Sequence, residues 1–338
     1  MKYCGLLLMG LLCFQTGFSQ TGTVKPALEN ARVLMQQGEY DRAAAFLQQS
    51  RQLEPLNPEL LKNLSYVYYL QRDFAGAIEA GKAAVATDSA DQQTFQILGL
   101  SYKAIAAYKE ANKMYRSALK KFPGSGMLYS ELGESLKEDN QPKEAIAQWE
   151  LGIEKDPNYS GNYYHAVQYY QQQQNLVRVL LYSELFVNLE SFTSRTKEMK
   201  ASLAASLAGL LKPGVINGLS KIAALTAFEK QVLQHYNKNS QLIANGLSID
   251  NISSIRTRFV LDWYNAAADR FPYRLFDQWQ YLIRQGLFEA YNQWLLGETV
   301  NKDAYLLWQN THAGETTNFQ EFQQSRVFKL VTGQYYMQ

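Results

Sequence analysis

The sequence predicts an all-α protein that begins as a series of helical hairpins. Two observations carry this prediction. Small and aromatic residues recur in phase every 34 residues between positions 24 and 159, and a period of about 34 residues is that of a two-helix repeat. Beyond residue 19, no stretch of useful length alternates between apolar and polar residues as a strand does.

The fullest copy of the pattern spans residues 92–125. Gly99 lies in its expected first helix, Ala111 and Ala118 lie in its second, and Pro123 closes the unit. Small residues are needed at these places because packed helices lie only about 8–10 Å apart. The remaining pattern positions are aromatic or leucine, namely Phe95, Leu98, Tyr102, Tyr108, Tyr115 and Leu119.

The same pattern occupies residues 24–57, 58–91 and 126–159, and a degenerate copy covers 160–192. In that last copy Val179 and Phe186 replace two small residues, so we expect the helix packing to change there. On these residues the chain resembles the tetratricopeptide-repeat (TPR) family over about 24–192. The resemblance implies an array, residues 20–192, that forms a right-handed α-solenoid.

Residues 193–338 keep helical signals without the strict phase, so they predict an irregular helical C-terminal domain. Expected helices cover residues 194–211, 222–236, 252–270, 302–310 and 318–331, with Thr193 or Ser194 and then Ser248 as helix caps. Residues 272–297 resemble a worn TPR hairpin whose turn is at Gly286. Trp279 and Tyr291 stand there in place of small residues.

The first 19 residues have the pattern of a bacterial secretory signal. Lys2 precedes an apolar run of about 10 residues, and Gly17 and Ser19 supply a small-x-small cleavage site. The run is too short to span a bilayer, which needs about 20 residues. We therefore expect an exported protein, periplasmic or outer-membrane-associated, that is soluble after cleavage. Two alternatives stay open: an uncleaved N-terminal segment, and lipidation at Cys13, which Leu12 before it disfavours.

Composition argues against several classes of function. The 33 Lys and Arg nearly balance the 31 Asp and Glu, so the chain lacks the basic field typical of nucleic-acid binding. Both cysteines lie in the expected signal, and the histidines His165, His235 and His312 have no neighbours at a metal-ligand spacing. The motifs of serine hydrolases and phosphate-binding loops are absent. We expect a protein that is not an enzyme and has no cofactor and no metal.

In TPR proteins the first helix of each unit lines a concave groove that binds the partner. Only Asn63 fits the pattern of the two-carboxylate clamp that binds chaperone tails, so that ligand is disfavoured. The resemblance implies a partner protein or peptide with both apolar and polar groups, bound by Arg32, Lys62, Tyr66, Tyr69, Lys103, Lys137, Tyr164 and Gln168. An exposed face without a ligand is the alternative.

Aromatic residues concentrate in the C-terminal half. Their helical spacing favours a structural role in a core, because each ring buries about 150–250 Å². The functional alternative is a site for a glycan or small molecule at Trp263, Trp279, Trp294 and Trp308. The sequence thus predicts a non-enzymatic interaction scaffold or adaptor of the cell envelope, with an envelope ligand-binding protein as the alternative.

Overall fold

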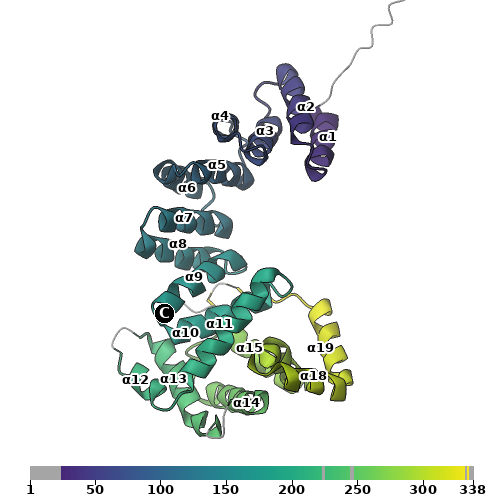
Figure 1. Ribbon diagram of the computed structural model, residues 1–338. Coiled ribbons are helices and arrows are strands. Elements are labelled where there is room, and N and C mark those ends of the chain that lie inside the picture. The colour runs from purple at the N-terminus through teal and green to yellow at the C-terminus, as the bar shows by residue number, and fades with distance from the viewer. Residues whose placement is uncertain (1–23, 223–224, 244–246, 332, 335–338) are drawn as a thin grey trace, which may run out of the picture. The chain divides into compact units, whose positions relative to one another are not determined.

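The computed structural model describes residues 24–222, 225–243, 247–331 and 333–334 (Figure 1). These residues form helices and connecting turns without a strand, which confirms the all-α prediction. The expected signal, residues 1–19 with Cys4 and Cys13, lies outside the described residues. Within them, no helix combines the length and apolar character needed to cross a bilayer. Contacts divide the chain into two compact units, the first ending at Ala90 and the second beginning at Asp91.

The first unit consists of two helical hairpins. Asn57 and Asp73 cap the helices of the second hairpin, each accepting a hydrogen bond from a backbone N–H three residues ahead. The core is formed by buried Ala31, Leu34, Ala43, Leu47, Leu60 and Leu64. The helices are α1 (Val24–Gln36), α2 (Tyr40–Leu53), α3 (Pro58–Leu70) and α4 (Phe74–Val85).

The second unit begins with three more hairpins, which Figure 1 shows stacked one on the next. Their helices are α5 (Gln92–Ala104), α6 (Tyr108–Lys121), α7 (Gly126–Glu138), α8 (Pro142–Lys155), α9 (Ser160–Gln172) and α10 (Leu176–Leu189). A methyl group on Gly99 would lie 1.9 Å from the hydroxyl oxygen of Tyr115. One repeat later, a methyl group on Gly133 would lie 2.1 Å from Nε1 of Trp149. The small residues therefore make room for large rings of the paired helix.

The turn inside each hairpin recurs with the period of the sequence. Gly38, Arg72, Ala106, Asn140 and Gln174 all have positive φ, between 54° and 78°, and each lies 34 residues after the one before. Directly after Ala106, the N–H of Ala107 donates to the carbonyl of Tyr102 at 2.9 Å. This hydrogen bond closes the turn as in a Schellman motif.

The hairpin at residues 272–297 repeats this turn. Gly286 has φ 69°, and the N–H of Leu287 donates to the carbonyl of Leu282 at 2.9 Å. The flanking helices are α15 (Arg274–Arg284) and α16 (Phe288–Asn292). The latter continues through a π-helical turn, η2 (Gln293–Gly297), into α17 (Glu298–Val300). The backbone therefore keeps the hairpin geometry although large rings replace the small residues.

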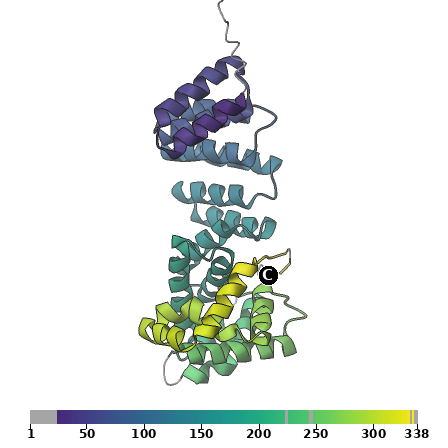
Figure 2. The ribbon, with the colours of Figure 1, turned by 90° about the vertical axis from the view of Figure 1, so that its right-hand side faces the viewer.

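The other C-terminal helices are α11 (Ser194–Leu210), α12 (Val215–Leu219), α13 (Ala227–Asn239), η1 (Ser240–Ile243), α14 (Ile249–Ala266), α18 (Lys302–Thr311) and α19 (Ala313–Ser325). Among them, α11, α14, α18 and α19 contact this hairpin or its continuation η2. Thr193 and Ser248 cap α11 and α14 as expected. Figure 2 shows α19 on the near face of the second unit.

Three expected helices have different bounds. The helix expected at 252–270 spans Ile249–Ala266. The helix expected at 222–236 begins only at Ala227, because Thr226 and Glu229 form a capping box there; its residues 223–224 lie outside the described residues. The helix expected at 318–331 ends at Ser325. Beyond it, the Asn158 side chain donates to the carbonyl of Leu330 at 2.9 Å and accepts from its N–H at 2.8 Å. The backbone groups of Leu330 are therefore satisfied by Asn158 instead of by hydrogen bonds within a helix.

Candidate functional site

In the first unit, the expected binding residues lie on the first helix of each hairpin. Arg32 on α1 is exposed and pairs with Glu29 at 2.6 Å. Lys62 on α3 lies 3.2 Å from Glu59. Tyr66 is 39% exposed, and Tyr69 packs its ring 5.9 Å from that of Phe74. Tyr66 is therefore the large apolar side chain that α3 offers to a partner.

In the second unit, side chains link the first helices α5, α7, α9 and α11 to one another. We call the face they form the first-helix surface. Glu131 on α7 accepts from Gln96 on α5 at 2.9 Å and from Lys103 at 2.6 Å. Lys103 also donates to Glu134 at 2.9 Å. The ammonium group of Lys103 thus lies between two carboxylates of the next repeat.

These contacts favour the charged forms of Lys103 and Glu134. Burial opposes the charge of Lys103, but Glu131 and Glu134 outweigh that effect and raise its pKa. Burial likewise opposes the charge of Glu134, yet Lys103 and other cations lower its pKa. Glu131 and Glu134 lie three residues apart on α7, and Glu131 is buried. Both carboxylates lie on α7, the first helix of the repeat that follows Lys103, but the sequence pattern does not show that they pair with it.

His165 on α9 extends the chain of contacts. Its Nε2 lies 3.2 Å from Oε1 of Glu134, and its ring stacks on Trp149 with the centroids 5.1 Å apart. Burial lowers the pKa of His165 to about 4, although Glu134 favours the charged form. The ring is therefore neutral at pH 7, and its contact with Glu134 is not an ion pair.

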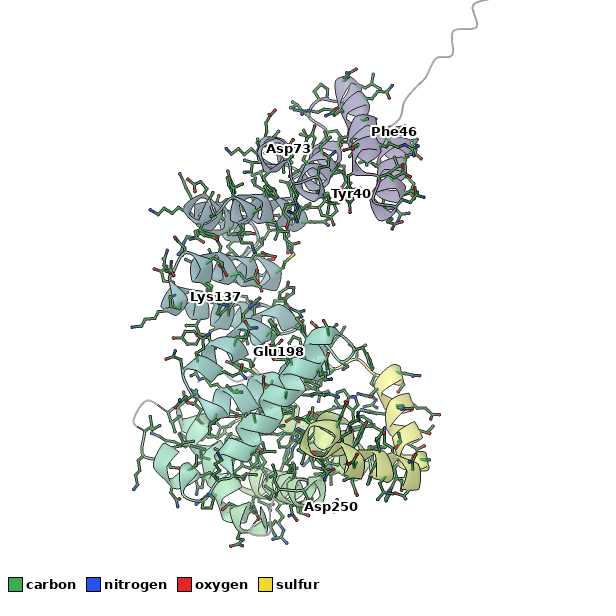
Figure 3. All side chains as sticks on the ribbon, in the orientation of Figure 1. Tyr40, Phe46, Asp73, Lys137, Glu198 and Asp250 are labelled. Carbon is green, nitrogen blue, oxygen red and sulfur yellow. The ribbon has the colours of Figure 1, made fainter. Side chains whose placement is uncertain are left out.

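The linkage continues from α9 to α11, beyond the last expected repeat. The hydroxyl of Tyr164 donates to Glu198 at 2.9 Å, and the guanidinium carbon of Arg195 lies 5.0 Å from the Tyr164 ring centroid. Gln168 on α9 is half-buried, and Lys137 on α7 is exposed. Figure 3 labels Lys137 and Glu198 on their helices. The sequence reading named Tyr164 and missed Glu198, because α11 lies outside the periodic region.

The four C-terminal tryptophans do not share one site. Trp263 and Trp279 are each 1% exposed and pack with Phe259 and Phe276 in the core. Trp294 lines a cavity of about 610 Å³, and Trp308 lines a different one of about 280 Å³. A surface of four rings for a glycan is therefore not formed, and ligand binding in this half stays a prediction.

The described residues give no sign of a metal centre. In the part of the chain that the structure describes, no three His, Cys, Asp or Glu residues are grouped to hold an ion. His235 is buried and its Nδ1 lies 2.7 Å from the carbonyl oxygen of Gln231, while His312 stacks on Trp308 with ring centroids 4.8 Å apart.

Comparison with known proteins agrees with the repeat pattern. The family model described as "Tetratricopeptide repeat" matches residues 28–92. Among curated proteins, Tetratricopeptide repeat protein 21B of mouse is 23% identical over 207 residues, 61% of this chain. The human protein of that name is 26% identical over 130 residues, 38% of this chain. The matches span only 14% and 10% of those relatives' own lengths.

Solved structures with a similar arrangement include two bacterial proteins. The pilF protein of Pseudomonas aeruginosa is 17% identical with a TM-score of 0.47, covering 62% of this chain and 96% of that one. A thermophilic TPR protein of Thermus thermophilus is 16% identical with a TM-score of 0.44, covering 55% of this chain and 99% of that one.

Proposed function

We propose that this chain, which is a tetratricopeptide-repeat protein over part of its length, is a non-enzymatic scaffold of the cell envelope. A TPR fold indicates protein–protein interaction, and the repeats here keep their turns over five hairpins. In our proposal the chain binds a peptide segment of a partner protein on the first helices of its repeats.

The observation that carries the proposal is the linked first-helix surface. Each successive first helix there is joined to the next through Lys103, Glu134, His165 or Tyr164. Side chains held in this way lose little freedom when a ligand binds, which favours affinity. Because Lys103 is already neutralised and His165 is uncharged, the surface suits a peptide of mixed polarity rather than a highly acidic one.

The first unit offers an apolar site of its own on α3. Tyr66 is exposed, and tyrosines are enriched among the residues that dominate binding energy at protein interfaces. Tyr69 lies one turn further along α3 and rests on Phe74. We propose that these two rings bind an apolar side chain of the partner.

Export is part of the same proposal. The pattern of residues 1–19 supports a cleaved signal, and the rest of the chain lacks cysteine, which suits an oxidising compartment. Expression of the full chain in a bacterial host tests this. The expected result is a protein in the periplasmic or outer-membrane fraction whose first residue is Gln20. A full-length protein in the cytosolic fraction would contradict it.

Partner binding is tested by cross-linking in the envelope fraction of the source cells, followed by capture of the tagged chain. We expect a partner that is retained by the wild type and lost with Tyr66→Ala combined with Tyr69→Ala. The matched control is Phe46→Ala, since Phe46 lies on α2, the second helix of its hairpin, and is equally exposed at 39%. A partner retained by the double variant, or lost equally with Phe46→Ala, would rule out the binding site on α3.

A further inference from the structure

A cavity of about 610 Å³ lies in the second unit, between α11 and the helical run formed by η2, α17 and α18. Its volume is in the range of about 300–1,000 Å³ that is typical of small-molecule sites. One wall includes a π-helical turn, a feature that often occurs at functional sites. The side chains that decide its chemistry are Lys197, Lys200, Trp294, Glu298, Lys302 and Tyr305.

Lys200 is the central group of this cavity. Its ammonium donates to the backbone carbonyl of Trp294 at 2.6 Å and lies 4.0 Å from the centroid of the Trp294 ring. An ammonium has three N–H donors, so these contacts leave it able to donate to a ligand. Burial lowers the pKa of Lys200 to about 8, with Glu298 opposing the shift. A half-buried cation is costly unless an anion accompanies it.

The charge around Lys200 is not balanced. Lys197 and Lys302 also line the cavity, and Glu298 is the carboxylate among its lining residues. No ion pair joins any of these three lysines to a carboxylate in the described part of the chain. By contrast, Lys103 and Arg256, which are also largely buried, each have a carboxylate partner. An anion from outside the chain would complete the site.

We propose that this cavity binds a small organic anion, whose carboxylate or phosphate group is held by Lys200 with Lys197 and Lys302. The apolar part of the anion would lie against Leu295, Tyr305 and the side chain of Phe192, which is 79% exposed at the rim. This site shares α11 with the first-helix surface but uses other residues of that helix, and the proposal does not depend on partner binding there.

A purely structural role for Lys200 makes a different prediction. If the lysine serves only to join α11 to η2 through Trp294, removing its charge lowers stability and leaves anion binding unchanged. If it serves a ligand, Lys200→Met removes an uncompensated buried charge. The melting temperature then stays within a few degrees of the wild type or rises, while anion binding falls.

The test uses the full chain and the fluorescent aromatic anion 8-anilinonaphthalene-1-sulfonate. We expect one saturable site per chain, which phenyl phosphate or benzoate displaces and neutral benzyl alcohol does not. The stronger of the two competitors identifies the phosphate or the carboxylate as the preferred group. Lys200→Met should weaken binding at least tenfold. The matched control, Lys143→Met at an exposed lysine on α8, should leave it unchanged.

A second variant keeps the test decisive if Lys200→Met does not fold. Lys197→Gln combined with Lys302→Gln changes only exposed side chains, and it should weaken binding about fivefold. The proposal is overturned if the wild type shows no saturable site, if benzyl alcohol competes as well as the anions, or if binding survives these substitutions unchanged.

Discussion

Arg256 on α14 and Glu184 on α10 form a buried ion pair across 72 residues of sequence. The two side chains are each 2% exposed. Glu184 also accepts from Nε1 of Trp279 and from the hydroxyl of Tyr291, both at 2.7 Å. The ring of Trp279 lies 4.0 Å from the guanidinium carbon. The pair therefore joins the last repeat helix to the worn hairpin through one network.

Glu184→Gln should destabilise the second unit strongly. The substitution keeps the shape but leaves Arg256 as a buried cation without a counter-charge. Breaking such a pair costs about 3–5 kcal/mol. Urea denaturation measures the change. The control is Glu144→Gln, which breaks the exposed pair with Arg116 and should cost no more than about 0.5 kcal/mol.

The double variant Glu184→Leu with Arg256→Met separates charge from packing. It should recover part of the loss, because no unpaired charge remains. Recovery is incomplete since Trp279 and Tyr291 lose their acceptor. A double variant as unstable as Glu184→Gln alone would show that the unpaired charge is not the cause.

The repeats were predictable because their contacts are local and periodic. Gly99 meets Tyr115 within one hairpin, and the period brings Gly133 to Trp149 in the next. The Glu184 network was not predictable, since residues far apart in sequence and outside any period form it. The same limit applies to the cavity at Lys200, whose walls come from helices almost 100 residues apart.

For the candidate site, the sequence predicted which helix face the residues lie on, but not how their side chains pair. The family pattern placed Lys103, Lys137 and Tyr164 on first helices, where the structure has them. The family pattern could not show that the ammonium group of Lys103 donates to the carboxylates of Glu131 and Glu134. Pairing between side chains of neighbouring repeats depends on how the two repeats are rotated and spaced. Whether these residues bind a partner stays a prediction.

Gly133→Ala should destabilise the second unit. Its new methyl group would overlap Trp149 and displace the ring from its hydrogen bond to the carbonyl of Ser130. Overpacking of this kind costs about 1–3 kcal/mol. The control is Gly209→Ala in α11, where the methyl group would meet only Leu176 at ordinary contact distance and should stabilise by about 0.5–1 kcal/mol. In thermal denaturation, Gly133→Ala should lower the melting temperature and Gly209→Ala should raise it. Equal shifts in the two variants would contradict the close contact between Gly133 and Trp149.

Ala106→Gly should stabilise the protein. Ala106 has φ 56°, a left-handed conformation that alanine adopts at a cost and glycine adopts freely. We expect a gain of about 0.5–1 kcal/mol in denaturant unfolding. Ala205→Gly is the control, because Ala205 is exposed in the interior of α11, where glycine is less favourable than alanine by about 1 kcal/mol. That control should lose stability, and a gain in both variants would refute the explanation.

His165 should make the second unit sensitive to mild acid. Burial lowers its folded pKa to about 4, whereas histidine in an unfolded chain titrates near 6.5. Below about pH 6.5 the unfolded state therefore binds a proton that the folded state does not, so stability falls as pH falls towards 4. Between pH 7 and pH 5 the loss from this one group is about 2 kcal/mol.

His165→Gln isolates that contribution. Urea unfolding at pH 7 and pH 5 should show a smaller acid-induced loss in the variant, by about 2 kcal/mol, whatever its stability at pH 7. Carboxylates that titrate in the same window are present in both proteins, so they cancel in the difference. His312→Gln leaves His165 in place and should keep the full loss. An equal loss in wild type and His165→Gln would mean that burial does not hold the ring neutral, and that Glu134 can pair with a charged imidazole on the first-helix surface.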